Sequence, residues 1–478
     1  MTVRVDTPQL QVTLRKLVRN QSGKAARYSS GPSSFDLSAW LTEDSSVSVT
    51  RQINAPSGSF SITVSDRVVV HGETMDSLYG IVEPMDVVEI RMARRATQKL
   101  PLVFRGIVSK ISRDEAMGQD GKPRRFLTIA GQDWGKFFQI IQNRWYKGAS
   151  LAKDWMSAWH MQTLYGIEYQ VMTAGQTVQV LLEKIGNPFI ARLQLDKAAM
   201  PKFTWDVSGA DDIDKVFPQG FQPNPGGTLW NFLSMYGDLG PFYELFIDDE
   251  EAAPRVIYRK PPFIAADGKP VHKTQAAEVP ILAKNITRLS VTRSDEDVAN
   301  YWWVDHKRLM FQTGHEAQWM QLGSAANPFL PNDHPSASPE IYGNRPMEVS
   351  SNHGFMTPGA PEPVVQQETT EYIAYTNAKR LRLQAANKDN VLFESGQMVL
   401  AGNEEVKVGR MLSVNRGGLV SRYYAQGVTH NFQPFRAFTT SVSFIRGTGF
   451  IARSSKEIGA KHPYLSEIGR GPYEGDLA

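Results

Sequence analysis

Several stretches of the chain alternate apolar and polar residues with a period of two, which is typical of half-buried β-strands. In the first stretch, two alternating runs flank a turn at residues 54–58, and this predicts a β-hairpin. Further runs at residues 88–92, 101–111 and 124–131 bring the unit at residues 45–131 to five or six antiparallel strands, enough for a small barrel. The alternating apolar residues of the hairpin are Val47, Val49, Ile53, Phe60, Ile62 and Val64.

A strand is also expected near the start of the chain, where Leu10, Val12 and Leu14 alternate with polar residues. At the other end of this unit, Asp133 has the residue type of a helix N-cap. The apolar residues behind it follow helical spacing, so we expect an amphipathic helix that closes the barrel. Those residues are Trp134, Phe137, Phe138 and Ile141.

The pattern changes to a mixture of helices and strands between residues 145 and 283. Residues 175–186 have a helical period, and a second helix is expected within residues 226–240 with Thr228 as its N-cap. A strand at 243–248 and a strand starting at 255 predict a hairpin across an acidic turn, which is interpreted as a solvated loop. These elements indicate an α+β middle domain.

A second β unit follows, and it begins with a short internal repeat. The sequence LSVTR at residues 289–293 repeats VSVTR at residues 47–51, and each repeat heads the first strand of a β unit. A helix is expected over residues 369–388, and alternating runs over residues 388–450 complete the unit. We interpret this as a duplicated barrel.

The predicted fold is therefore mainly β with an α+β insertion: two tube-like antiparallel β-barrel domains and a middle α+β domain. The long loop-rich stretch inside the second barrel is interpreted as an insertion, since such loops are uncommon in compact domains. The expected division is a first barrel at 1–145, a middle domain at 146–283, a second barrel at 284–308 and 367–450, an insertion at 309–366 and a C-terminal tail at 451–478.

Composition narrows the class of protein. The chain has 478 residues, 41% of them hydrophobic, and a net charge of +3, which does not indicate a large sequence-independent nucleic-acid surface. It has no cysteine, which excludes disulfides and thiolate chemistry. No signal peptide and no membrane-spanning run is recognised, so no membrane insertion is expected.

Motifs for catalysis are missing from the sequence. The nine histidines are scattered, and His315-Glu316 is not followed by the second histidine of a zinc-peptidase helix. His430 lies within a β run and is expected to be a hydrogen-bonded structural residue. No phosphate-binding loop or nucleophile elbow occurs. We therefore expect no catalytic, cofactor-binding or metal-binding residue, no cofactor, and no enzymatic activity.

A basic cluster remains as the best nucleic-acid candidate, but it lacks the interleaved aromatic residues of a single-strand binder. We expect it instead to face an acidic protein neighbour. It consists of Arg91, Arg94, Arg95, Lys99 and Arg105.

Three parts of the sequence together resemble one family, the baseplate hub proteins of bacteriophage tails (gp27-like or Mu gp44-like tail proteins). They are the opening strands, an aromatic segment with the strand that follows it, and the closing strands. The resemblance covers most of the chain, but not the loop at residues 342–369 or the tail after Arg453. The residues that carry it are 47–66, 86–92, 102–114, 299–311, 342–351, 402–414 and 423–447.

The resemblance implies a homotrimer whose two barrels per chain form a pseudo-six-fold ring. The ring would join a six-fold tail tube, or a tube-initiator protein, to a three-fold central spike, and would open for DNA passage on infection. Further partners it implies are the baseplate wedge and tape-measure proteins, with genomic DNA only in transit. It places the protein in the tail baseplate of the virion, assembled in the host cytoplasm.

Two alternatives stay open. The chain could be a hub-type component of a contractile secretion system, or a tail-associated cell-wall hydrolase with its site in the middle domain. In the hydrolase, Trp155, Trp159, Trp205 and Trp230 would line a sugar cleft.

Overall fold

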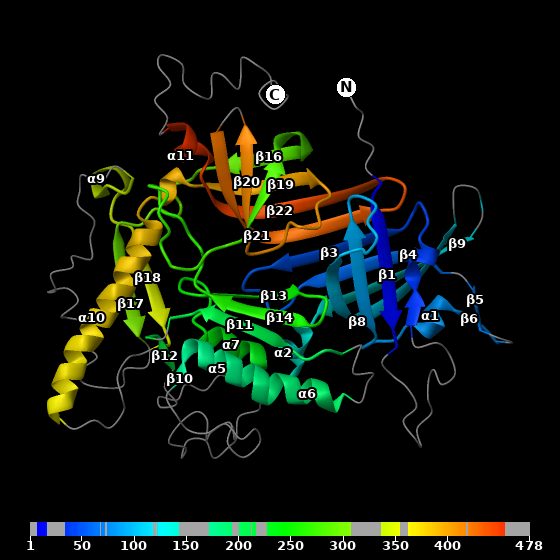
Figure 1. Ribbon diagram of the computed structural model, residues 1–478, viewed down its shortest axis with the longest axis horizontal. Coiled ribbons are helices and arrows are strands. Elements are labelled where there is room, and N and C mark those ends of the chain that lie inside the picture. The colour runs from blue at the N-terminus through cyan, green and yellow to red at the C-terminus, as the bar shows by residue number, and fades with distance from the viewer. Residues whose placement is uncertain are drawn as a thin grey trace, which may run out of the picture.

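A computed structural model of the chain shows one large antiparallel sheet, a smaller mixed region and a long helix at its side (Figure 1). The prediction of a mainly β fold with an α+β part is confirmed. The structure describes residues 7–16, 34–66, 68–71, 74–117, 121, 123–142, 172–193, 200–211, 213–216, 227–306, 336–353, 362–416 and 419–454.

The first β unit contains the hairpin, the N-terminal strand and the other strands expected from the alternation. Its elements are β1 (Gln9–Arg15), β2 (Ser34–Asp36), β3 (Ser46–Gln52), β4 (Ser59–Ser65), β5 (Val68–His71), β6 (Thr74–Ser77), α1 (Leu78–Ile81), β7 (Val87–Ala93), β8 (Leu102–Met117) and β9 (Pro123–Asp133). Its core is formed by the apolar faces of these strands, with Val47, Ile62 and Ile129 fully buried.

The second β unit is built from later strands and a short terminal helix. Its elements are β15 (Glu278–Leu282), β16 (Ile286–Thr292), β19 (Glu394–Ala401), β20 (Met411–Arg416), β21 (Leu419–Gln433), β22 (Ala437–Gly447) and α11 (Gly449–Ser454). Antiparallel pairing of β3 with β21 joins the two units into one 13-stranded sheet. The order along the sheet is β16-β19-β22-β21-β3-β4-β9-β8-β7-β1-β2; off this path, β20 pairs with β21 and β15 pairs with β20.

The two units share one strand order. Numbered by position in the chain, the six main strands of each unit lie in the order 1-4-5-6-3-2: β1-β7-β8-β9-β4-β3 and β15-β20-β21-β22-β19-β16. The single difference in direction is that β15 runs parallel to β20, whereas β1 is antiparallel to β7. The two copies of the repeated sequence, in β3 and β16, occupy the same place in this order, which supports the interpretation of a duplication.

The fifth strand of each unit also has the same irregularity. β8 has a register shift against β9 between Val108 and Lys110, and β21 has one against β22 between Ala425 and Gly427. A bulge bends the strand and increases its twist. The first half of each long strand pairs with the preceding strand of its own unit, β7 or β20.

The middle region packs helices and small sheets around its own core. Its elements are α2 (Lys136–Ile140), β10 (Met172–Thr173), α5 (Ala174–Leu181), η3 (Leu182–Gly186), α6 (Asn187–Arg192), β11 (Thr204–Gly209), β12 (Lys215–Val216), α7 (Leu229–Tyr236), β13 (Glu244–Asp249), β14 (Pro254–Arg259), β17 (Tyr301–His306), α9 (Pro339–Tyr342), β18 (Pro346–Ser351) and α10 (Glu362–Asn387). Thr228 is the N-cap of α7 as predicted, and its side chain accepts a hydrogen bond from the Asn231 amide at 3.2 Å.

The prediction that Asp133 caps a helix is wrong. Asp133 ends strand β9, and the short helix α2 starts after Gly135 without a side-chain cap. The aromatic residues behind it, Trp134, Phe137 and Phe138, are buried in the core of the middle region, so the helix does not close the barrel. Helical spacing identified the buried face of α2 but not the core that covers it.

Several strands lie in a different region from the one that the expected domain boundaries give them. β15 lies in the large sheet, although its residues fall in the range expected for the middle domain. β17 and β18 form a parallel pair outside the large sheet, and Trp302 and Val304 of β17 contribute to the core of the middle region. Most of the expected insertion and tail lie outside the described residues.

Candidate functional site: the joint between the two β units

The joint is the edge at which β3 meets the second half of β21. Val47 lies opposite Phe432 and Val49 opposite His430, and these four side chains are all buried. On the other face, the Thr50 and Thr429 hydroxyls are 3.0 Å apart. The joint is thus apolar on its inner face and hydrogen-bonded on its outer face, as expected for cross-strand pairs in a half-buried sheet.

His430 has the structural role expected of it. Its Nδ1 lies 3.0 Å from the Thr440 hydroxyl and its Nε2 lies 3.1 Å from the carbonyl oxygen of Val406. Burial lowers the pKa of this imidazole to about 4, so the ring is neutral at pH 7. The two hydrogen bonds of this neutral ring connect β21 to Thr440 of β22 and to the loop at Val406.

Arg51 connects the joint to the middle region. Its guanidinium pairs with Asp249 at the end of β13, and its Nε lies 3.4 Å from Asp133. Burial alone would lower the pKa of Arg51, but the two carboxylates raise it overall. Asp249 also accepts a 2.6 Å hydrogen bond from the amide of Arg105. Since both acids are almost fully buried, Arg51 is the charge that compensates them.

The acidic turn after β13 is exposed at Glu250 and Glu251, as predicted for a solvated loop, but its acids are held by contacts with other parts of the chain. Asp249 is buried, Asp248 pairs with Lys407 at 2.6 Å, and Glu251 accepts two hydrogen bonds from Arg91 at 2.7 and 2.8 Å. The Arg91 contact is the main reason that the pKa of Glu251 falls to about 2. The hairpin tip therefore docks against the first β unit.

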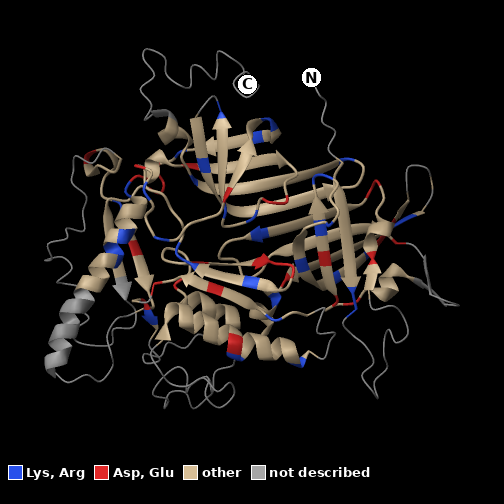
Figure 2. Ribbon diagram, viewed as in Figure 1, with Lys and Arg blue, Asp and Glu red and all other residues tan. Residues whose placement is uncertain are grey.

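This docking also identifies a neighbour for the basic cluster. Arg105 donates to the Glu250 and Glu251 carbonyls at 3.3 and 3.0 Å, and Lys99 lies 3.6 Å from the Glu251 carboxylate. Arg94 contacts the second β unit, with its amide 3.1 Å from Glu404, while the Arg95 side chain is exposed. The acidic neighbour of the cluster is thus largely the chain itself. Figure 2 shows acidic and basic residues dispersed over the elements rather than gathered on one.

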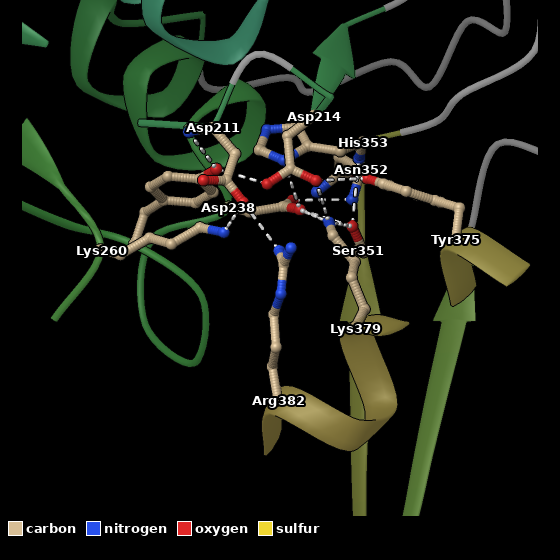
Figure 3. A network of polar contacts seen from close by, with 12 residues as sticks. Asp211, Asp214, Asp238, Lys260, Ser351, Asn352, His353, Tyr375, Lys379 and Arg382 are labelled. Carbon is tan, nitrogen blue, oxygen red and sulfur yellow. Dashed lines mark hydrogen bonds and ion pairs between the residues drawn. The ribbon is translucent and has the colours of Figure 1, made fainter. Parts of the chain in front are cut away.

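A second group of polar residues joins α10 to the rest of the middle region (Figure 3). From α10, Tyr375 donates to Asp214 at 2.5 Å and Arg382 donates to Asp211 at 2.8 Å. Lys379 lies 3.4 Å from Asp214 and 3.6 Å from Asp238. Burial alone would raise the pKa of Asp214, but Lys379 and hydrogen bonds from two tyrosines lower it overall.

Ser351, His353 and Asp238 lie together in this network but not as a nucleophilic triad. Ser351 donates to Asp238 at 2.5 Å rather than to the histidine. The Nε2 of His353 lies 2.7 Å from the carbonyl oxygen of Tyr236. All three residues are buried, so no base is positioned to activate the hydroxyl toward a substrate. The arrangement supports a structural role for the network.

A cavity of about 180 Å³ lies beside this network. Its charged lining residues Lys260, Lys379 and Arg382 each pair with an aspartate of the network. The cavity therefore does not present these charges to a ligand. Among the described residues, no three His, Asp or Glu side chains gather in a way that could hold a metal ion. No described helix is long and apolar enough to cross a membrane.

The tryptophans considered for a sugar cleft do not form one in the described part of the chain. Trp155 and Trp159 lie outside the described residues. Trp205 and Trp230 pack against the core of the middle region.

Comparison with known proteins found no matching protein-family model and no matching curated protein. Among solved structures, the chain is similar to a tail protein from Neisseria meningitidis MC58, with 12% identity, a TM-score of 0.47, and coverage of 93% of this chain and 98% of that one. It is similar to the 43 kDa tail protein of prophage MuSo2 from Shewanella oneidensis, with 10% identity, a TM-score of 0.46 and the same coverage of both chains.

A third similar structure is a component of the type VI secretion system of E. coli, described as structurally similar to the T4 bacteriophage tail proteins gp27 and gp5. Its identity is 9% and its TM-score 0.37, covering 84% of this chain and 74% of that one. These proteins belong to the classes to which the sequence bears a resemblance. At such identities and TM-scores these similarities assign no function to the chain.

Proposed function

We propose that this protein is the structural hub of a phage-type tail baseplate, a homotrimer in which two β units per chain form a ring of six. The ring adapts a six-fold tail tube, or its initiator protein, to a three-fold central spike, and genomic DNA passes through it. Wedge and tape-measure proteins are further partners in the virion, and the chain assembles in the host cytoplasm.

The observation that carries this proposal is the duplication within one sheet. Two units with the same strand order and the same bulge position are joined edge to edge by β3 and β21. A chain with two similar units allows three copies to present six similar positions to one partner and three to another. The middle region is attached to β3 of the sheet through the buried ion pair of Arg51 with Asp249, which supports a structural role for it.

Light scattering of the purified full-length chain tests the proposal. The expected mass is three times 53.4 kDa, and it should not change when the sample is diluted over a wide range. A mass of one chain at every concentration would contradict the ring. Binding of a candidate spike protein to the trimer, and not to the dissociated chain, is the second expected result.

A further inference from the structure

Several strand edges of the large sheet have no partner among the described strands, and two of them are related to the internal joint. One is the outer edge of β16, which pairs only with β19. The other is the second half of β8, from Ser109 onward, which pairs with β9 on one side only, because β7 ends its pairing at Ile107. Open edges present unpaired backbone donors and acceptors to another chain.

These two edges correspond to the two strands of the internal joint. β16 occupies the place of β3, and the second half of β8 occupies the place of the second half of β21. The internal joint therefore shows how such edges pair when both are present. The two strands that pair inside the chain, β3 and the second half of β21, therefore have counterparts in β16 and the second half of β8 whose edges are open.

The residue correspondence can be fixed by two independent routes. Aligning the repeat in β3 and β16 equates Val47 with Leu289, and following the pairing through β4 and β19 leads to Ile129 and Val442. Aligning the bulges of β8 and β21 leads to the same pair, because Ile111 lies opposite Ile129 and Val428 opposite Val442. The two routes agree without adjustment.

Burial distinguishes the closed joint from the open edges. Val49 in β3 is 3% exposed, whereas its counterpart Val291 in β16 is 44% exposed. Ile111 and Leu289 are only partly buried, while their counterparts Val428 and Val47 are buried. The open edges thus expose apolar residues on the face that the internal joint covers.

We infer that neighbouring chains join by pairing β16 of one copy, antiparallel, with the second half of β8 of the next, in the register of the internal joint. This inference rests on the proposed ring and names its contact surface. Thr292 then lies opposite Ser112, as Thr50 lies opposite Thr429, so that hydroxyls again face each other across the joint. Val291 lies opposite Arg113, whose charge is already paired with Asp66 at 2.9 Å.

The contact is head-to-tail, because each copy contributes a different edge to each of its two neighbours. Such contacts produce rings when the rotation closes. Repeating the geometry of the internal joint at each chain boundary makes every boundary between units alike, whether it lies within a chain or between chains.

Disulfide cross-linking tests the register directly, since the chain has no cysteine of its own. The variant carrying Ser112→Cys and Thr292→Cys should form covalent oligomers up to the closed ring under mild oxidation, because residues directly opposite in antiparallel strands lie within disulfide reach. The control carries Ser112→Cys and Ser290→Cys, a diagonal pair beyond that reach, and its cross-linked fraction should be at least about fivefold lower.

A charge variant tests the surface without relying on cysteine. Val291→Lys places a charge on the face that the contact would bury, and burying a charge opposes association. We expect the mass to fall from three chains to one. Val420→Lys is the matched control, because Val420 is 47% exposed on the first half of β21, away from both open edges, and the trimer mass should be retained. Circular dichroism verifies that both variants fold.

The outcomes separate this inference from the proposed function. A trimer that does not cross-link in the predicted register, or that survives Val291→Lys, overturns the β16–β8 contact and leaves the hub proposal standing. A parent chain that is monomeric at every concentration overturns both.

Discussion

The internal joint and the open edges use the same strands of a duplicated unit, yet they differ in what surrounds them. At the internal joint, Val49 and Arg51 of β3 are covered by β21 and by the tip of the β13–β14 hairpin. At the open edge, Val291 is exposed, and the Arg293 guanidinium lies over the Phe450 ring at 3.4 Å. The central valine of the same short sequence is therefore buried where it occurs in β3 and exposed where it occurs in β16.

The largest expected difference is between lysine substitutions at the two equivalent valines. Val49→Lys buries a charge in the core of the joint, and should cost on the order of 5 kcal/mol or prevent folding. Val291→Lys should leave the chain folded and affect only the assembly. Soluble yield and thermal unfolding followed by circular dichroism measure the difference in stability between the two variants. Equal stability of the two variants would contradict the prediction.

Removing the arginine that ends each repeat should give the next largest contrast. Arg51→Met leaves Asp133 and Asp249 buried without their compensating charge, and we expect a loss of about 3–5 kcal/mol in the free energy of unfolding. Arg293→Met removes only a cation–π contact near the surface and should cost about 1 kcal/mol or less. Denaturant titration of both variants measures the difference. Equal losses would show that Arg51 is not the compensating charge.

The pH dependence of stability should separate the internal joint from the open edge in a third way. The pKa of His430 is about 4 when folded and 6.5 unperturbed, so the unfolded chain binds a proton first as the pH falls. The stability that comes from keeping His430 neutral is fully present above pH 6.5, and it is lost as the pH falls toward 4. The loss in the free energy of unfolding is on the order of 3 kcal/mol, at about 1.36 kcal/mol for each pKa unit between the two values.

His430→Gln keeps a hydrogen-bonding side chain but removes this titration, so it should flatten the stability profile between pH 6.5 and 4. The matched control is Thr50→Val on the outer face of the same joint, which removes no titrating group and should leave the slope in this pH range unchanged. Denaturant midpoints across the range measure both. A slope that persists in His430→Gln would assign it to another group.

The smallest expected effect concerns the hydroxyl pair on the outer face of the joint. Thr50→Val removes an exposed cross-strand hydrogen bond and should cost about 0.5–1 kcal/mol. Thr292→Val, made in a Val291→Lys chain that does not assemble, should change the unfolding free energy by less than about 0.5 kcal/mol. Equal effects would indicate that the valine replacement acts through strand propensity alone.

The sequence predicted the units better than it predicted their contacts. Alternation located β3, β4 and β7 because each strand is half-buried, and four shared residues indicated the duplication. The pairing of Thr50 with Thr429 spans 379 residues, and no local pattern encodes it. Asp133 shows the limit most clearly: the residue type that suggested a helix cap is used in a buried ion pair whose second acid lies in another region of the chain.

That long separation also bears on how the chain is made. At synthesis rates of about 5–20 residues per second, β3 emerges from the ribosome roughly 20–75 s before its partner on β21 exists. During that interval the nascent first unit exposes an edge rich in valine and threonine, to which a neighbouring nascent chain could add a strand. Polysomes crowded with this message would thus favour exchanged strands between copies, and slower initiation should raise the yield of correctly closed chains.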